Sequence, residues 1–245
     1  LVTYNDFNDS WYGTLRDVSE NDIFATSADF ISWDSDEIVV PFDPTFSTGF
    51  NIGNRIFVLQ ADTPACEVFY TDDNGATWSA GTVLTGISSI LPASYAFKVS
   101  GTVYVLIQPG VTTFSILSTT TGLTYSQTVL PFSAPLNVIG VCYFSGLFYF
   151  RTRNTSTDED TIYTSATIAT VIGSYTEVNS FTPDPDGFNG LYVVNSGSTI
   201  AAPFVDVGGG PTDYDIGTQT ADNGMTITTV GTVSGTFFDF TQSTT

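Results

Sequence analysis

Apolar and polar residues alternate in short stretches along most of the chain, and tight polar turns separate these stretches. The clearest example begins at Val68, where an alternating stretch leads into Asn74-Gly75 and then into a second stretch that opens on Trp78. Asn-Gly between alternating hydrophobic positions is one of the strongest sequence signals for a β-hairpin. The pattern therefore predicts antiparallel strands joined by hairpins.

The same hairpin pattern recurs at regular intervals. Residues 71–78 (TDDNGATW), 118–125 (STTTGLTY) and 220–227 (TADNGMTI) share a hydroxyl residue, a glycine and a Thr before the last position. Weaker copies lie at 26–33, which lacks the glycine, and at 163–175, which has a longer turn. The last positions of the five copies are 45, 47, 50 and 52 residues apart. That spacing is typical of a four-stranded propeller blade and is far longer than a coil of a β-helix.

The strands predicted around these turns form five units. The first unit has three candidate strands, near 11–15, 22–25 and 31–33, and lacks an innermost one, whereas 235–240 is left without a unit. We therefore expect an all-β fold, a five-bladed β-propeller of four-stranded antiparallel blades. In this fold the C-terminal strand joins the N-terminal blade, closes the ring and removes an exposed edge. The predicted units of this single domain, 1–245, are 1–40 plus 235–245, 41–86, 87–134, 135–183 and 184–234.

Residues 71–78 resemble the Asp-box, or bacterial neuraminidase repeat, whose pattern is Ser/Thr-x-Asp-x-Gly-x-Thr-Trp. They match every defined position, and 118–125 and 220–227 match with one or two substitutions. The resemblance implies a structural turn in which the glycine adopts a positive φ, the Asp carboxylate accepts N–H bonds and the aromatic residue wedges between sheets. Ordinary hairpins of a β-sandwich are the alternative. The residues assigned to these turns are Thr71, Asp73, Gly75, Thr77, Trp78, Ser118, Gly122, Thr124, Tyr125, Thr220, Asp222, Gly224 and Thr226.

Composition supports the β prediction. Hydrophobic residues make up 42% of the chain and aromatic residues 14%, but charged residues only 12%, about half the usual share. The 39 Thr and 24 Ser mean that hydroxyl groups rather than charges keep the protein soluble. Threonine and aromatic residues suit a pleated surface, whereas the helix formers Lys, Glu and Arg are scarce.

Charge and missing residue types exclude several functions. The net charge is −20, from 25 acids and five basic residues, so the chain has too few cations for a nucleic-acid groove or an anionic membrane surface. No apolar stretch reaches the ~20 residues of a membrane span. The absence of histidine excludes Ser-His-Asp and Cys-His chemistry. Cys66 and Cys142 both lie in apolar, strand-like stretches, which indicates buried free thiols or a single disulfide.

The predicted strand map places most of the acids on the face opposite the Asp-box turns. Three interpretations stay open: a solvated surface, a calcium site or a carboxylate pair acting on a glycosidic bond. Calcium is the one cofactor that the sequence offers, with Asp158, Asp160, Asp184 and Asp186 as candidate ligands. The predicted acidic face comprises Asp17, Glu20, Asp22, Asp36, Glu37, Asp43, Asp62, Asp158, Glu159, Asp160, Asp184, Asp186, Asp206, Asp213 and Asp215.

The resemblance to sialidases does not extend to their active site. Those enzymes hold the substrate carboxylate with three arginines, whereas this chain has four arginines in all, with Arg151 and Arg153 together on one strand. An acidic face would also repel an anionic sugar. We expect a non-enzymatic recognition module on a virion surface, such as a phage spike or tail protein, or an extracellular one. Its partners would be other virion or surface proteins, or a host glycan or receptor. The alternative is a secreted glycoside hydrolase or a glycan-binding lectin.

Overall fold

The computed structural model describes most of the chain between residues 2 and 181 and the strands of one further sheet. The described residues are 2–5, 10–16, 22–29, 32, 34–43, 47–62, 65–87, 89–90, 96–181, 192–194, 199–204, 213–220 and 227–234. They are all β apart from one 3-10 turn at Ile172–Ser174. None of them belongs to a helix that is long and apolar enough to cross a membrane.

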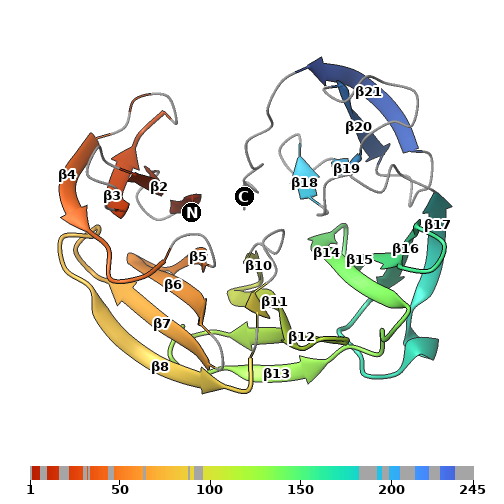
Figure 1. The fold of residues 1–245 in the computed structure, drawn as a ribbon, viewed down its shortest axis with the longest axis horizontal. Coiled ribbons are helices and arrows are strands. Elements are labelled where there is room, and N and C mark those ends of the chain that lie inside the picture. Colours follow the sequence, from red (N-terminus) through yellow and green to blue (C-terminus); the bar gives the residue numbers. More distant parts are fainter. Residues whose placement is uncertain are drawn as a thin grey trace. The chain divides into compact units, whose positions relative to one another are not determined.

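The described strands form five antiparallel sheets that follow one another along the chain (Figure 1). In each sheet the main four strands pair in chain order, and β9 adds to the third sheet by pairing with β11. The sheets consist of β1 (Val2–Asn5), β2 (Ser10–Arg16), β3 (Asp22–Ser27) and β4 (Asp34–Val39); β5 (Ser47–Ile52), β6 (Arg55–Asp62), β7 (Ala65–Thr71) and β8 (Ser79–Thr85); β9 (Ser89–Ile90), β10 (Phe97–Val99), β11 (Thr102–Gly110), β12 (Thr113–Thr119) and β13 (Ser126–Val129); β14 (Leu136–Phe144), β15 (Leu147–Asn154), β16 (Glu159–Ser165) and β17 (Thr176–Phe181); and β18 (Tyr192–Val194), β19 (Thr199–Phe204), β20 (Asp213–Thr220) and β21 (Ile227–Ser234).

The prediction of an all-β chain with four-stranded antiparallel sheets is confirmed. The first sheet differs from the prediction in two respects. Its first strand is β1, which pairs with β2 from Val2 opposite Gly13 to Asn5 opposite Ser10, so four strands from the N-terminal segment form this sheet. Its outermost strand, β4, begins at Asp34 rather than in the predicted 31–33. The predicted C-terminal strand and its role in ring closure lie outside the described residues.

Contacts between Cα atoms divide the chain into two compact units. The first consists chiefly of Leu1–Val111 and Leu117–Gln127, and the second of Thr112–Ile116 and Thr128–Ser243. The first unit contains the first and second sheets, and the second unit contains the fourth and fifth.

Within the first unit, alternation along the strands builds a core between the second and third sheets. Phe57 and Leu59 of β6 point to the same side as Val68 of β7 and pack with Val105 and Ile107 of β11; all five are at most 1% exposed. Because residues two apart in a strand share a face, the opposite side of β6 is free to pack elsewhere. Ile56 and Val58 belong to a separate core cluster with residues of the first sheet.

Aromatic residues from the segments between sheets reinforce these cores. Phe42, which follows β4, meets Trp78 edge to face, with ring centroids 5.0 Å apart and planes at 77°. In the second unit, Phe132 follows β13 and meets Tyr175 in the same way, at 5.0 Å and 65°. In both cases the partner is the last residue of a sequence repeat. The repeated aromatic position therefore packs against the segment that enters its own sheet.

Candidate functional site

Each of the five sequence repeats occupies the same position in its own sheet, the connection from the third to the fourth strand. The third strands end at a hydroxyl residue every time. These end residues are Ser27, Thr71, Thr119, Ser165 and Thr220. The first four are buried, at 1–7% exposure. Each of these four hydroxyls accepts the N–H of the residue two positions later, which turns the chain sharply at the end of the strand.

The turn at 71–78 has the contacts of an Asp-box. The Thr71 hydroxyl donates to Asp73 Oδ1 at 2.7 Å and accepts the Gly75 N–H at 2.9 Å. Thr77 donates both its N–H and its hydroxyl to the Asp73 carboxylate, at 2.8 and 2.6 Å. The hydrogen bonds from Thr77 and then Thr71 lower the pKa of Asp73 from 3.8 to about 2. The carboxylate is thus fully occupied in holding the turn.

The glycines of two repeats press against aromatic rings of the preceding sheet. Gly75 has a φ of 94° and Gly122 a φ of 72°, in the left-handed region that favours glycine. A Cβ on Gly75 would lie 2.1 Å from the Phe24 ring, and one on Gly122 would lie 2.2 Å from the Phe57 ring. Phe24 belongs to the first sheet and Phe57 to the second. The glycine of a repeat is therefore required both by its backbone and by the close approach of two sheets.

The turn of the repeat at 118–125 is one residue shorter than its sequence alignment indicates. Thr119, rather than the predicted Ser118, accepts the N–H of Thr121 and of Gly122, at 3.2 and 2.8 Å. Thr121 takes the place of the Asp, since it accepts the Thr124 N–H and shares a hydrogen bond with the Thr124 hydroxyl at 3.0 Å. The Ser118 hydroxyl bonds instead to the main chain of β13. Ser118 is thus corrected from a turn residue to a strand residue.

The third predicted Asp-box is described only at its ends. Thr220 is the last residue of β20, the same position that Thr71 occupies in β7. Asp222, Gly224 and Thr226 lie outside the described residues, and their roles stay predictions.

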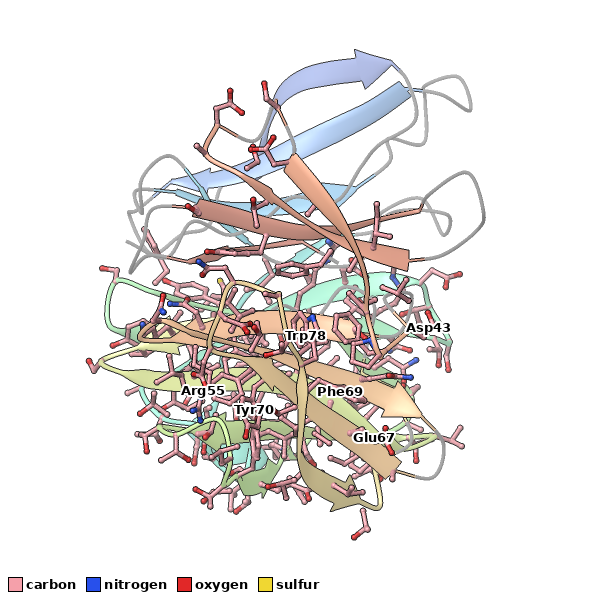
Figure 2. The ribbon with its side chains drawn as sticks, turned by 90° about the vertical axis from the view of Figure 1, so that its left-hand side faces the viewer. Asp43, Arg55, Glu67, Phe69, Tyr70 and Trp78 are labelled. Carbon is pink, nitrogen blue, oxygen red and sulfur yellow. The ribbon has the colours of Figure 1, made fainter. Side chains whose placement is uncertain are left out.

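An ion pair between Arg55 and Asp72 lies on the surface at one end of the second sheet, next to the repeat turn. The Arg55 Nε and Nη2 atoms donate to the two carboxylate oxygens of Asp72 at 2.7 and 2.8 Å. The guanidinium carbon lies 4.5 Å from the centroid of the Tyr70 ring (Figure 2). This bidentate, stacked arrangement is the geometry that arginine favours over lysine. Arg55 starts β6 and Asp72 follows β7, so the pair bridges the ends of two neighbouring strands.

The corresponding end of the third sheet carries a hollow of about 210 Å³. The hollow belongs to the first compact unit, and one of its lining residues is Tyr125, whose hydroxyl donates to the Gly122 carbonyl at 2.7 Å. Every side chain around it ends in a hydroxyl, and none is charged. The lining residues are Thr102, Ser118, Thr119, Thr120, Thr124, Tyr125 and Ser126.

A second hollow, of about 320 Å³, lies at the end of the fourth sheet, in the second compact unit. It combines hydroxyls with apolar side chains, and again no charged group lines it. Tyr149 is 2% exposed there, and burial raises the pKa of its hydroxyl. The lining residues are Leu147, Tyr149, Thr164, Ser165, Ala166, Ser174, Thr176 and Val178.

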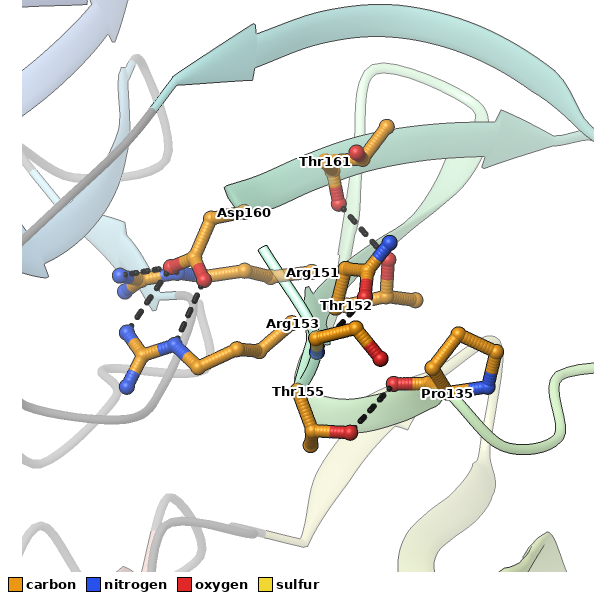
Figure 3. Close-up of polar contacts among 9 residues, drawn as sticks. Pro135, Arg151, Thr152, Arg153, Thr155, Asp160 and Thr161 are labelled. Atoms are coloured by element: carbon orange, nitrogen blue, oxygen red, sulfur yellow. Dashed lines mark hydrogen bonds and ion pairs between the residues drawn. The ribbon is translucent and has the colours of Figure 1, made fainter. Parts of the chain in front are cut away.

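Two arginines share one buried carboxylate in the fourth sheet. Asp160 accepts from Arg151 Nε at 2.7 Å and from Arg153 Nε and Nη2 at 2.7 and 3.1 Å (Figure 3). The Arg151 and Asp160 side chains are fully buried, and that of Arg153 is 13% exposed. Arg153 lies directly opposite Asp160 in the β15–β16 pair. Asp160, which the predicted strand map placed on the acidic face, is instead buried and paired with two arginines.

The acidic face and the calcium site find little support in the described part of the chain. Both oxygens of Asp160 are engaged by guanidinium groups, which is a poor environment for a further cation. Asp158 is exposed in the β15–β16 turn. No group of three or more Cys, Asp or Glu residues that could hold a metal ion occurs among the described residues. Asp184 and Asp186 lie outside them.

The two cysteines are buried and free. Burial, followed by the nearby charge of Glu67, raises the pKa of Cys66 to about 12, and burial alone raises the pKa of Cys142. Neither thiol is a nucleophile at neutral pH.

Sequence reasoning missed the hollows and the shared carboxylate. Thr102, Ser126 and Leu147 belong to no motif, so nothing marked them before the strand ends were known. The Arg-x-Arg pattern on one strand was visible, but its partner Asp160 is identified only by the strand register. Tyr12 is 2% exposed and donates to Asn74 Oδ1, so it fills the core rather than presenting an aromatic surface to a ligand.

No family model and no curated protein matches this chain. Solved structures do resemble it in fold. A lectin from Aleuria aurantia, described as a six-bladed β-propeller with a novel fucose recognition mode, superimposes with a TM-score of 0.62. The sequences are 10% identical, and the match covers 96% of this chain and 77% of the lectin.

Two further neighbours are of other kinds. An exo-β-1,3-galactanase from Phanerochaete chrysosporium, solved with galactose, gives a TM-score of 0.53 at 11% identity. The match covers 82% of this chain but only 55% of that enzyme. A neuraminidase-like protein of an isolate from the little yellow-shouldered bat gives 0.57 at 12% identity, covering 95% of this chain and 82% of that one. These likenesses identify the β-propeller fold and leave activity open, because one fold hosts many functions.

Proposed function

We propose that this chain is a glycan-binding β-propeller module that recognises neutral sugars and does not cleave them. The observation that carries the proposal is the pair of uncharged hollows at the repeat ends of the third and fourth sheets. Hydroxyl groups both donate and accept hydrogen bonds, as the hydroxyls of a sugar do. A lectin and two glycan-related proteins among the neighbours in fold are consistent with this choice.

The charge of the chain supports neutral rather than anionic ligands. At a net charge of −20, a sialylated or sulfated glycan approaches against long-range repulsion. The basic residues Arg55, Arg151 and Arg153 are already paired with carboxylates. Anionic glycans are therefore expected to bind more weakly than neutral ones.

Binding without reaction is the second part of the proposal. Glycosidases of the common kind place two carboxyl groups on either side of the scissile bond. No carboxyl group lines either hollow.

We also propose that the five sheets are five blades of one ring. The comparisons do not support the virion role that composition led us to expect, and we propose the glycan-binding alternative in its place.

A glycan array tests this function, followed by mass spectrometry of the bound glycans after prolonged incubation. We expect the full chain to retain neutral glycans, to retain their sialylated forms less well and to leave both intact. Failure to bind any neutral glycan would contradict glycan recognition. A shortened glycan would show that the protein is a glycoside hydrolase.

A further inference from the structure

The two hollows occupy the same place in their sheets. In each sheet a two-residue turn joins the first and second strands, so Thr102 faces Val99 in one and Leu147 faces Phe144 in the other. The residues in these turns adopt nearly the same φ values, 49° and 82° in the third sheet and 48° and 86° in the fourth. Thr102 and Leu147, the first residues of the second strands, are therefore equivalent.

The third strands extend this equivalence to the rest of the lining. β12 ends at Thr119 and β16 at Ser165, the two buried hydroxyls that start the repeat turns. Counting from these residues, the one before and the one after also line both hollows. The equivalent pairs are Ser118 and Thr164, Thr119 and Ser165, and Thr120 and Ala166. One structural position thus forms a hollow twice.

The second sheet has long, paired side chains at the same position. Ile52 and Arg55 face each other across a two-residue turn, so Arg55 is equivalent to Thr102. β7 ends at Thr71, which makes Tyr70 equivalent to Ser118 and Asp72 equivalent to Thr120. The Arg55–Asp72 pair, stacked on Tyr70, therefore spans the space that the third sheet leaves to hydroxyls. In the first sheet the corresponding loop lies outside the described residues.

Size and chemistry indicate the class of ligand. A volume of about 210 Å³ corresponds to roughly seven water molecules, since each takes about 30 Å³ in the liquid. Such a space is large enough for one small polar ring. All seven lining side chains bear a hydroxyl and none is charged, which suits a neutral polyol. The hydroxyls of Ser118, Thr119, Thr124 and Tyr125 also take part in hydrogen bonds within the protein.

We infer that the hollows of the third and fourth sheets are two equivalent binding sites, each for one neutral sugar unit. At the equivalent position of the second sheet, the Arg55–Asp72 pair fills the space and blocks binding. This inference rests on the proposed glycan-binding function. Two weak sites on one chain bind a branched or repeating glycan more tightly than either site alone, provided the glycan can reach both. The Thr and Ser residues of the repeat ends would then serve recognition as well as folding.

The chain supplies its own closing group for a test. Thr102→Arg with Thr120→Asp copies the second-sheet pair into the third sheet, and Leu147→Arg with Ala166→Asp copies it into the fourth. Arg55→Thr with Asp72→Thr makes the reverse change. Each double substitution adds or removes one charge of each sign, so the net charge stays at −20. Electrostatic effects on the whole molecule are thereby controlled.

Threonine methyl NMR measures binding at each site separately. The full chain, labelled at Thr methyls, is titrated with methyl glycosides of glucose, galactose, mannose and fucose. We expect at least one glycoside to shift Thr102, Thr120 and Thr124 in the third sheet and Thr164 and Thr176 in the fourth. In the third-sheet closing variant, which replaces Thr102 and Thr120, we expect the Thr124 shift to be lost, and in the fourth-sheet variant those of Thr164 and Thr176. Each variant should keep the shifts of the other sheet, which also shows that it is folded.

The opening variant gives the converse result. Arg55→Thr with Asp72→Thr introduces two threonine methyls at the second-sheet position, and we expect both to shift with the same glycoside. Shifts that persist in both closing variants, or that fall on other parts of the chain, would refute the site assignment while leaving glycan binding intact. No shift with any glycoside, together with an empty glycan array, would overturn the proposed function itself.

Discussion

At the scale of single residues, burial decides how much the loss of one partner of an ion pair lowers the stability of the fold. Asp160 and its two arginines are removed from water, whereas the Arg55 side chain is 33% exposed and that of Asp72 59%. A charge left unpaired in the interior carries a large desolvation penalty, but an exposed one is rehydrated. The same pair of residue types therefore has different consequences in the fourth and the second sheet.

We predict that Asp160→Asn lowers the free energy of unfolding by about 3–5 kcal/mol, because it leaves two guanidinium groups without their counter-charge. Asp72→Asn, the matched control at the surface, should lower it by less than about 1 kcal/mol. Urea unfolding of both variants measures the two losses. Equal losses would contradict the buried position of the Asp160 carboxylate.

The contribution of Asp73 to stability is expected to depend on pH. Its pKa is lowered on folding from 3.8 to about 2, so the folded state favours the charged form. Its contribution to stability is therefore complete above about pH 4 and is lost as the pH falls through about 2. Asp73→Asn lacks this titration. We expect the gap between the melting temperatures of the wild type and the variant to narrow as the pH is lowered from 5 to 2, as measured by calorimetry.

The comparison with a variant is needed because the other acids titrate in the same range. A gap that stays constant over this range would show that the Asp73 carboxylate does not hold the turn.

At the scale of elements, the repeat turn joins neighbouring sheets through its glycine. Gly122 and Gly101 both have positive φ values, 72° and 82°, but only Gly122 lies against another sheet. An added Cβ at Gly101 has no atom within 4 Å, whereas at Gly122 it meets the fully buried Phe57 ring. Comparing substitutions at the two glycines separates two losses of stability: that from placing a side chain at a positive φ, and that from disturbing the contact between sheets.

Gly122→Ala should therefore destabilise the protein by about 1–3 kcal/mol more than Gly101→Ala, the usual penalty for forcing an extra methyl group into a packed core. Thermal or urea unfolding of both variants measures the difference. If the two substitutions cost the same, the repeat glycine serves its own turn only and the contact with the second sheet is not formed.

The sequence predicted the elements better than it predicted their details. The spacing of hydroxyl, glycine and aromatic positions located the turn between the third and fourth strands, because local hydrogen bonds and positive φ act within a few residues. It placed the hydroxyl of the repeat at 118–125 at Ser118 instead of Thr119, since neighbouring hydroxyl residues cannot be distinguished without knowing where the strand ends. The hollows depend on residues far apart in the chain, Thr102 and Ser126 for example, which only the strand register brings together.

At the scale of the whole molecule, the described strands of the first sheet all lie within residues 2–39. The sequence led us to assign a strand from the C-terminal segment to this sheet, because residues 2–5 carry a pattern too short to be recognised. Strand β1 pairs with β2, so the four described strands of this sheet all come from the N-terminal segment. We therefore predict that the first sheet is stable without residues 235–245.

A chain truncated after Ser234 should retain the cooperative unfolding of the first sheet and most of the stability of the full chain. Hydrogen exchange of β2 and β3 amides, compared between the two lengths, measures this directly. Loss of protection in β2 and β3 would contradict the prediction and would favour ring closure by the C-terminal strand.

The recognition of neutral sugars at the repeat ends is the central claim, and one glycan-array comparison tests it most directly. The array is probed with the wild-type chain and with the quadruple variant Thr102→Arg, Thr120→Asp, Leu147→Arg and Ala166→Asp, which has the same net charge. We predict that the wild type binds neutral glycans and that the variant, still folded by its circular dichroism and melting curve, does not. Equal binding by both proteins, or by neither, would contradict the account.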